Sequence, residues 1–254
     1  MKVVILIAIY LGLGISVAKA EFQTVGQGEA WLIGGAIEFE HLPYQQTDEL
    51  NTSLQPYVAY QWENLHIGVD NLSYNFFANT ALSLTMVLQP RWTPTDNDSA
   101  TFTGLERDDA LEAGLTVNYV FDQDLVSKWY WNSTFFADIS NAYKGHYATS
   151  ALGFQREYSR YELDITMGLS QQSAELNHYL YGVNMDEANL NRHVFTANSS
   201  LHPFAQLSLQ YQLTDKSLLI SQVNLDVLDQ SLEQSPLLAD NIYANALIGW
   251  IRIF

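Results

Sequence analysis

Six histidines offer the widest chemical repertoire in this 254-residue chain, because histidine serves as metal ligand, general base and proton shuttle. They stand at positions 41, 66, 146, 178, 193 and 202. The sequence has no H-E-x-x-H pair and no G-x-S-x-G, which argues against a helical zinc-protease site and a nucleophile elbow. His193 and His202 stand near Ser199 and Ser200, the residue types that a barrel hydrolase would bring together. We expect no enzyme and no catalytic residue, with a hydrolase kept as the third alternative.

Two acidic clusters are the other groups with chemical potential, Asp96-Asn97-Asp98 and Glu106-Arg107-Asp108-Asp109. Their oxygen atoms suit a divalent cation, such as one that bridges lipopolysaccharide. The spacing does not match an EF-hand, so solvated acidic loops are the preferred interpretation, and we expect no metal and no cofactor. Cysteine is absent, which removes disulfides and thiolate chemistry.

Composition narrows the class of protein. Lys and Arg total 11 against 28 Asp and Glu, a net charge of −17, which argues against a nucleic-acid partner. Only 15% of residues are charged while 48% are hydrophobic. Such a balance requires the apolar side chains to be sheltered from water, either in a core or by lipid.

The first twenty residues predict a secretory signal peptide. Lys2 supplies a positive start, and an apolar stretch of 15 residues runs from Val3 to Val17. That stretch is shorter than the roughly 20 residues of a membrane-spanning helix. Ala18-Lys19-Ala20 provides small residues for cleavage before Glu21. We therefore expect export, with residues 21–254 as one mature domain.

The mature chain alternates between apolar and polar residues. In the clearest segment, 161–170, every second residue from Tyr161 to Leu169 is apolar, and Glu162, Asp164 and Ser170 belong to the opposite face. Segments 111–121, 205–214 and 217–227 repeat this pattern. An alternation with a period of two residues is typical of strands with one apolar face. Apolar residues spaced three and four apart, which are typical of a helix, are missing from these segments.

The length of these segments favours a membrane barrel over a soluble sandwich. They reach about ten residues, which is what a tilted strand needs to cross a bilayer. Aromatic residues gather near strand ends, as in the girdles of outer-membrane barrels. Examples are Tyr57, Tyr60 and Trp62, then Tyr119 and Phe121, then Trp129, Tyr130 and Trp131. The predicted fold is an all-β, antiparallel, up-and-down transmembrane barrel in the outer membrane of a Gram-negative cell.

We count twelve strands, with ten as the alternative. They are expected near 29–40, 53–62, 65–75, 80–91, 109–121, 125–138, 146–155, 161–170, 192–202, 205–213, 217–227 and 243–254. This count conflicts with the rule that long loops face outward and short turns face the periplasm. The long connections 92–108 and 171–191 follow strands four and eight, which places them on the periplasmic side.

The last predicted strand carries a barrel-assembly signal. Counting back in twos from Phe254 gives Arg252, Trp250, Ile248 and Ala246 on one face. Trp250 and Phe254 match the aromatic pattern read by the assembly machinery of the outer membrane. Arg252 stands where an apolar residue is usual, and near a strand end it can extend its charge toward the headgroups.

Four short motifs resemble the MipA/OmpV family of outer-membrane proteins. They are Gly104-Leu105 with Asp109, Glu112 and Gly114; Gly145-His146; Tyr181-Gly182-Val183, with Tyr181 where phenylalanine is usual; and Ser235-Pro236. They occur in the family's order between positions 104 and 254. The resemblance implies an outer-membrane barrel, and some relatives are described as scaffolds joining a murein lytic transglycosylase to a peptidoglycan synthase.

The expected function is therefore a scaffold or interaction protein of the cell envelope. Its partners would be outer-membrane lipid, lipopolysaccharide and a periplasmic murein hydrolase or synthase. The alternative is a small-solute channel that prefers cations, because Glu112, Glu162, Asp164 and Asp226 belong to the polar faces of their strands.

Overall fold

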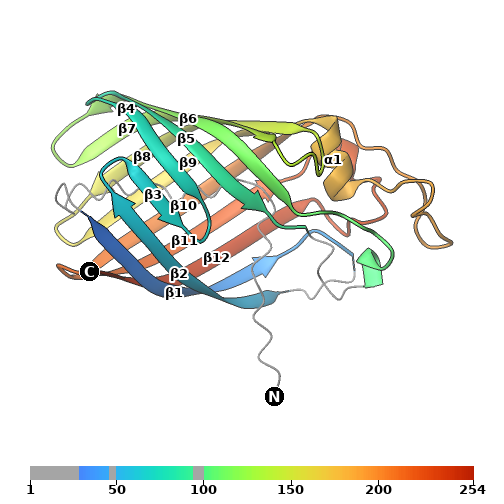
Figure 1. The fold of residues 1–254 in the computed structure, drawn as a ribbon, viewed down its shortest axis with the longest axis horizontal. Coiled ribbons are helices and arrows are strands. Elements are labelled where there is room, and N and C mark those ends of the chain that lie inside the picture. The colour runs from blue at the N-terminus through green and yellow to red at the C-terminus, as the bar shows by residue number, and fades with distance from the viewer. Residues whose placement is uncertain (1–28, 46–49, 94–99) are drawn as a thin grey trace, which may run out of the picture.

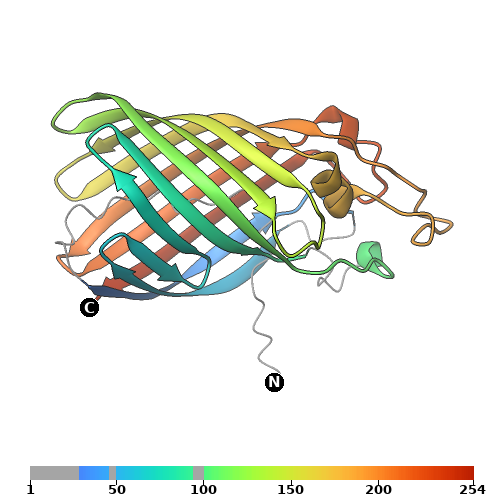
Figure 2. The same cartoon turned by 45° about the horizontal axis from the view of Figure 1, so that its top comes forward.

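A computed structural model describes residues 29–45, 50–93 and 100–254. In it the chain forms a closed antiparallel barrel of twelve strands, in which each strand pairs with the next and β12 pairs with β1 (Figures 1 and 2). This confirms the predicted fold class. The signal peptide and the Asp96-Asn97-Asp98 cluster lie outside the described residues and stay predictions.

Strands vary in length from four to fifteen residues. Their bounds are β1 Ala30–His41, β2 Asn51–Trp62, β3 Leu65–Gly68, β4 Leu72–Ala78, β5 Leu82–Arg91, β6 Ala110–Gln123, β7 Ser127–Asp138, β8 His146–Glu157, β9 Tyr161–Gln172, β10 Ser200–Thr214, β11 Ser217–Val227 and β12 Ile242–Ile253. The helical segments are α1 Ala174–Tyr181, η2 Ala100–Phe102 and η3 Gln230–Leu232. Within the described ranges, no helix has the length and apolar character needed to cross a bilayer.

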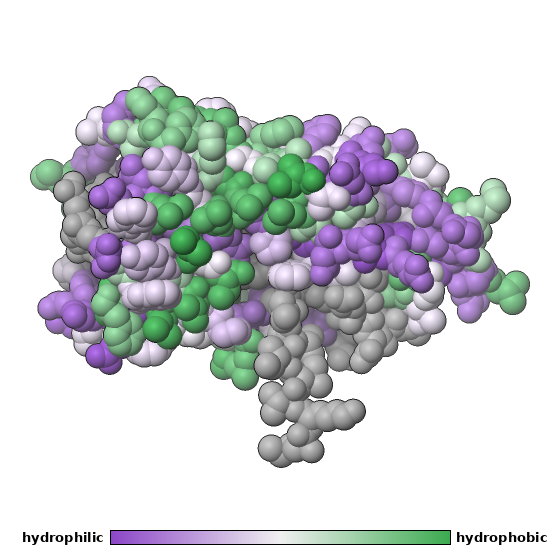
Figure 3. Space-filling view, viewed as in Figure 1, coloured by the Kyte–Doolittle hydropathy of each residue, from purple (hydrophilic) through white to green (hydrophobic). Residues whose placement is uncertain are grey.

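The predicted alternation places apolar side chains on the outer surface. In β9, Met167 is 62% exposed and Leu169 is also exposed, whereas Asp164 and Ser170 are buried. Since the polar face of each strand points into the barrel, the apolar face must meet the surroundings. Figure 3 shows apolar side chains over much of the barrel wall and polar ones gathered over the loops at one end.

The number of strands was predicted correctly, but two boundaries were wrong and compensated each other. The segment predicted as one strand at 65–75 folds back at 69–71 into β3 and β4. The region predicted as two strands, at 192–202 and 205–213, contains the single strand β10. Residues 192–199 belong to the loop before it. Pro203, between the two predicted strands, lies beside Leu169 of β9, and the pairing with β11 starts only at Phe204.

Splitting the third strand removes the conflict between loop length and sidedness. The long connections 92–109 and 173–199 now follow β5 and β9, so they lie at the same end as 42–50 and 228–241. Every connection at the opposite end is short, at 63–64, 79–81, 124–126, 158–160 and 215–216. We call these the loop end and the turn end of the barrel.

The prolines within strands lie where a strand has one paired neighbour. Pro56 of β2 pairs with Gly35 of β1, and the described ladder to β3 begins only at Ala59. Pro90 of β5 pairs with Leu111 of β6, and the described ladder to β4 ends at Leu88. A residue without an N–H cannot donate to a second neighbour, so proline is tolerated at these edges.

The two ends can be distinguished by cysteine labelling, since the natural chain has no cysteine. Leu190 at the loop end and Leu125 at the turn end are both fully exposed. Because long loops of outer-membrane barrels face outward, we expect Leu190→Cys to react with an impermeant maleimide on intact cells. Leu125→Cys should react only after the outer membrane is permeabilised. The reverse pattern would invert the orientation.

Candidate functional site: the cap and the lumen

Helix α1 and the described loop-end connections form a layer at this end of the barrel, which we call the cap (Figure 1). It comprises residues 42–45, 100–109, 139–145, 173–199 and 228–241. The helix begins at Ser173, whose side-chain oxygen accepts a hydrogen bond from the backbone N–H of Leu176, an ordinary N-cap. Gly145 lies against this helix start, and a Cβ there would collide with the Ser173 side chain. The neighbouring His146 donates its backbone N–H to Ser173 Oγ at 3.1 Å. The Gly145-His146 motif therefore holds the start of helix α1 in place, by close packing at Gly145 and a hydrogen bond from His146.

The cap contains a hydrophobic core whose members come from the whole circumference of the barrel. Tyr44, from the β1–β2 connection, packs edge-on against Phe102 and lies near Tyr181 of α1. Tyr143, from the β7–β8 connection, packs against Tyr179 of α1. The other buried members include Leu105, Phe136, Tyr147, Leu176, Leu180, Val183, Leu232, Leu237, Leu238 and Tyr243. One continuous core therefore joins the described loop-end connections from around the rim of the barrel.

Two of the family-like motifs meet in this core although they are about fifty residues apart. Ser235 Oγ donates to the backbone oxygen of Tyr181 at 2.6 Å and accepts from the N–H of Leu237 at 3.2 Å. Val183 is fully buried and forms a β-bridge with Phe195. Pro236 is half-buried beside Ser235. The two motifs, Tyr181-Gly182-Val183 and Ser235-Pro236, therefore contact each other directly in the folded chain.

Arg107 connects a further motif region to the same contact. Its guanidinium donates to the backbone oxygens of Tyr179 and Gly182, at 3.0 and 3.2 Å, and forms an ion pair with Glu187. Gly104 lies in the turn before Arg107 with φ of +78°, a conformation that favours glycine. Leu105 follows as a buried member of the cap core.

The motif residues on β6 reach inward below the cap. Glu112 is fully buried and receives hydrogen bonds from Arg91, from the Tyr143 hydroxyl and from Gln89. The Arg91 guanidinium lies 5.0 Å from the centre of the Tyr147 ring, a cation–π distance. This cluster fixes the cap to the barrel wall. Arg91 was not predicted from the sequence as a partner of Glu112. The signal that could have pointed to it was an arginine within a predicted strand of a chain with few basic residues.

Two motif residues of this region have packing roles. Asp109 accepts the backbone N–H of Thr93 at 2.9 Å and so joins the two ends of the β5–β6 connection. Gly114 lies against Phe136 of β7, where a Cβ would collide with the ring. The structure thus gives Asp109 and Gly114 structural contacts in the wall and cap.

Other acidic side chains in the barrel interior are held by hydrogen bonds. Glu38 of β1 accepts from Gln55 at 3.0 Å and from Asn245 at 2.8 Å, and Glu40 accepts from the Tyr243 hydroxyl at 2.8 Å. Asp164 accepts from the Tyr130 hydroxyl, at 2.8 Å for Oδ2. Asp226 is also buried, and Glu162 is half-buried. Glu38 and Glu40 thus link β1 to its neighbours β2 and β12, and Asp164 links β9 to β7 across the inner face of β8.

Ser200 and His202 do lie together, but the geometry opposes catalysis. His202 Nδ1 accepts the backbone N–H of Asp229 at 3.3 Å, so the ring proton stands on Nε2, which faces Ser200 Oγ. A general base needs the opposite tautomer, with a free lone pair toward the serine. His202 is also fully buried, whereas Ser199 and His193 are exposed loop residues. Among the described residues, no three His, Asp or Glu side chains converge as metal ligands.

The loop beyond α1 forms a protruding tip, residues 184–194. Arg192 ties it down by donating to the backbone oxygen of Thr101 at 2.8 Å and to that of Glu187 at 2.7 Å. Burial alone would raise the pKa of Glu187, but hydrogen bonds from Arg107 and Asn184 and the Arg107 charge outweigh it, so the pKa is lowered. Met185 and Leu190 remain exposed on this anchored tip.

The lowered pKa of Glu187 predicts that the tip loosens in acid. A carboxylate stabilised in the folded state loses that contribution as pH falls below its ordinary value, here 4.5, through the lowered pKa. A spin label on Leu190→Cys should become more mobile over that acid range. Adding Glu187→Gln should make the label mobile at neutral pH as well. An unchanged spectrum in the double variant would show that the ion pair does not hold the tip.

The predicted assembly residues lie on the outer face of β12 at the turn end. Trp250 and Phe254 are both exposed there, and the Phe254 backbone N–H donates to Trp31 of β1 at 2.9 Å, which closes the seam of the barrel. The Arg252 guanidinium lies 5.3 Å from the centre of the Phe254 ring. This position at the rim agrees with a charge directed toward headgroups. Recognition by the assembly machinery stays a prediction.

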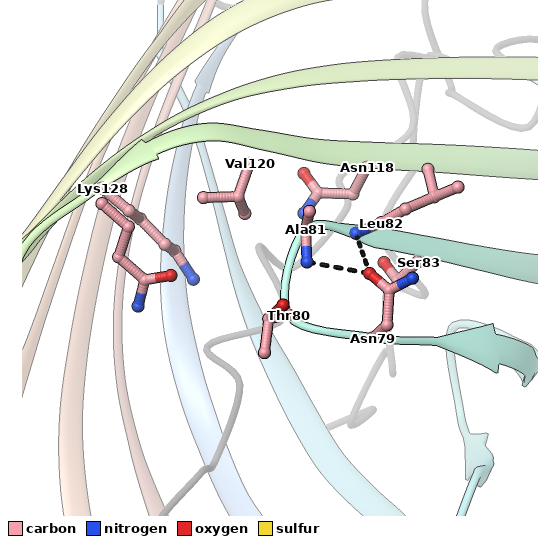
Figure 4. Close-up of a pocket in the computed structure, with 9 residues that line it drawn as sticks. Asn79, Thr80, Ala81, Leu82, Ser83, Asn118, Val120 and Lys128 are labelled. Carbon is pink, nitrogen blue, oxygen red and sulfur yellow. Dashed lines mark hydrogen bonds between the residues drawn. The ribbon is translucent and has the colours of Figure 1, made fainter.

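A small cavity of about 120 Å³ lies at the turn end. It is bounded by the β4–β5 turn and by inward-facing residues of β5, β6 and β7. Figure 4 shows Asn79 of the turn beside Ser83, with Asn118 and Lys128 on the neighbouring walls. No motif in the sequence had indicated this group, because its members come from three separate segments, 79–83, 118–123 and Lys128.

A closed antiparallel barrel with an apolar outer wall and a polar interior defines the class: an outer-membrane β-barrel protein. The chain belongs to the family described as MltA-interacting protein MipA, whose model matches residues 33–254. It is 27% identical over 183 residues to outer membrane protein Omp26La of Vibrio anguillarum, covering 68% of this chain and 69% of that protein. The family resemblance seen in the four motifs is confirmed, as is the outer-membrane location.

Solved barrels resemble the chain at low identity. The NanC porin aligns with a TM-score of 0.46 at 9% identity, covering 87% of this chain and 98% of that one. An anion-selective porin from Comamonas acidovorans aligns with a TM-score of 0.43 at 10% identity, covering 89% and 98%.

Proposed function

We propose that this barrel is a non-enzymatic scaffold of the cell envelope that binds murein enzymes on its periplasmic side. The observation that carries the proposal is the cap, whose continuous core joins loop-end connections from around the rim, and we infer that it closes this end of the lumen. A barrel closed in this way supports an interaction role better than solute passage. The name of the family, MltA-interacting protein, describes an interaction of the same kind.

The turn end offers a contact surface for such a partner. Leu125, in the β6–β7 turn, is 99% exposed, and its neighbour Val126 is also exposed. The β8–β9 turn lies beside it, because Glu157 donates its backbone N–H to Val126 at 2.7 Å. Tyr158 in that turn stacks on Tyr161 with 4.3 Å between ring centres. Exposed apolar and aromatic groups on short, rigid turns are typical of protein contacts.

A capture experiment with two matched variants tests this function. The affinity-tagged barrel is purified from detergent-solubilised envelope, and the captured lytic transglycosylase and peptidoglycan synthase are quantified. We expect Leu125→Asp at the turn end to reduce capture strongly and Leu190→Asp at the loop end to leave it unchanged. Both leucines are fully exposed, so neither change should disturb folding. Absence of murein enzymes, together with swelling of liposomes that carry the barrel, would replace the scaffold with the channel.

A further inference from the structure

The barrel wall is incomplete between β2 and β5 on the side of the loop end. The four-residue strand β3 pairs with β2 only from Ala59 to Trp62, so residues 51–57 of β2 have a described ladder partner only in β1. Across the break, β5 pairs with β4 only as far as Leu88, which leaves residues 89–91 paired with β6 alone. The β3–β4 hairpin therefore fills only the part of this wall that lies nearer the turn end (Figures 1 and 2).

Backbone groups of β2 point into this break. The Val58 carbonyl accepts the backbone N–H of Val69 in the hairpin turn at 3.2 Å, so Val58 turns its backbone toward the hairpin side. Since the backbone groups of an antiparallel strand alternate between its two edges, Thr52, Leu54 and Pro56 face the same side. No described residue accepts the N–H groups of Thr52 and Leu54 across the break. Hydrocarbon cannot supply that partner, so an open edge at this depth requires an oxygen acceptor.

The outer mouth of the break is apolar. Leu54 on the outer face of β2 is 73% exposed, and Val69 and Leu72 at the end of the hairpin are exposed as well. Asp70 turns its carboxylate to the lumen side, because one of its oxygens lies where a Cβ on the inward-facing Gly68 would stand. The surface around the break therefore combines apolar side chains with two backbone donors near the loop end.

Prolines on both edges argue against a further strand in the break. Pro56 of β2 and Pro90 of β5 lack the N–H that a docked strand would use. A second barrel in the same membrane is no match either. Its β2 would run in the same direction with the opposite tilt, so the two edges would cross instead of pairing. These edges favour an occupant that is thin, flexible and apolar, with an oxygen acceptor at one end.

We propose that an acyl chain of lipopolysaccharide lies in this break. Its ester or amide carbonyl oxygen accepts from the N–H of Thr52 or Leu54, and its hydrocarbon tail lies against Leu54, Val69 and Leu72. The position of the break selects this lipid, because the loop end faces outward and lipopolysaccharide forms the outward leaflet of the outer membrane. The site is independent of the scaffold role, which uses the turn end.

Photo-crosslinking in intact cells tests the site. The crosslinker p-benzoylphenylalanine is placed at Ser53, whose side chain faces inward beside the break, or at Thr149, which faces inward near the loop end of β8 on the opposite wall. The same group at Leu54, on the outer face, is the positive control. After illumination, the full-length barrel is purified and attached lipopolysaccharide is detected by immunoblot. We expect a strong adduct at Ser53 and none at Thr149.

Two variants of Leu54 separate the backbone donor from the side chain. Leu54→Pro and Leu54→Ala both remove the leucine, but only proline removes the N–H that faces the break. Proline is tolerated at this edge, as Pro56 shows, so both variants should fold. With the crosslinker at Ser53, the adduct should fall severalfold in Leu54→Pro and persist in Leu54→Ala.

Four results would overturn the proposal. No adduct at Ser53 beside a clear one at Leu54 would show that the wall is closed to lipid. An adduct at Thr149 as strong as at Ser53 would show that lipid enters the lumen by another route. Equal adducts in the two Leu54 variants would exclude the backbone donor. A phospholipid in place of lipopolysaccharide, identified by mass spectrometry of the Ser53 adduct, would refute the assigned lipid.

Discussion

Replacing Arg91 with methionine is expected to destabilise the folded barrel by about 3–5 kcal/mol. The guanidinium and the Glu112 carboxylate are both almost completely buried, with 1% and 0% of their side chains exposed. Removing the arginine leaves a carboxylate in the barrel interior without its charge partner, and Tyr143 and Gln89 can compensate it only by hydrogen bonds. Urea unfolding in lipid vesicles, followed by tryptophan fluorescence, measures the loss.

Two variants separate the charge effect from general damage. Arg91→Met combined with Glu112→Gln should recover most of the lost stability, because the double variant buries no unpaired charge. Arg156→Met is the matched control, since that arginine is exposed at the turn end, 5.3 Å from the Tyr158 ring, and the change should cost little. A small loss for Arg91→Met alone would show that water reaches Glu112, and with it that the cap is loose.

The second large effect concerns ion conduction. Wild-type barrels in planar bilayers are expected to show no steady conductance, because the cap core joins opposite walls across the lumen. Replacing residues 173–199 with a short Gly/Ser turn should produce steady, cation-preferring currents. Removing α1 and the tip takes away much of that core, and the acids of the interior would then meet water.

Two results of the conductance measurement would contradict this prediction. Steady current through the wild type would restore the channel as the favoured function, and anion preference in the shortened variant would contradict an acidic lumen. Conductance should be compared in Leu190→Asp, which changes one exposed side chain of the tip, leaves the cap core intact and should show no steady current.

Membership of the barrel class could be predicted from the sequence because period-two alternation is a local property. Each strand displays it without help from its neighbours, so the outer and inner faces of β9 and β11 were readable residue by residue. The compensating errors at 65–75 and 192–213 have a physical cause as well. The turn at 68–71 does contain turn-forming residue types, Gly68, Asp70 and Asn71, which the strand prediction passed over. Pro203 is tolerated in β10 because one side of it has no described partner.

The cap could not be predicted, although several of its residues belonged to the recognised motifs. The motif residues stood out one by one, but nothing local shows that Ser235 bonds to Tyr181 or that Arg107 reaches Gly182. The same holds for the small cavity at the turn end, which three segments build together.

Composition and alternation therefore determined, from the sequence alone, that this chain is a β-barrel whose apolar outer face meets lipid. Only the tertiary structure decided that the loop-end connections share one core and that the turn end carries a small cavity. Alternation is set by neighbours along the chain, whereas closure and cavities depend on contacts between loops far apart in sequence, which form only once the barrel has brought their ends together.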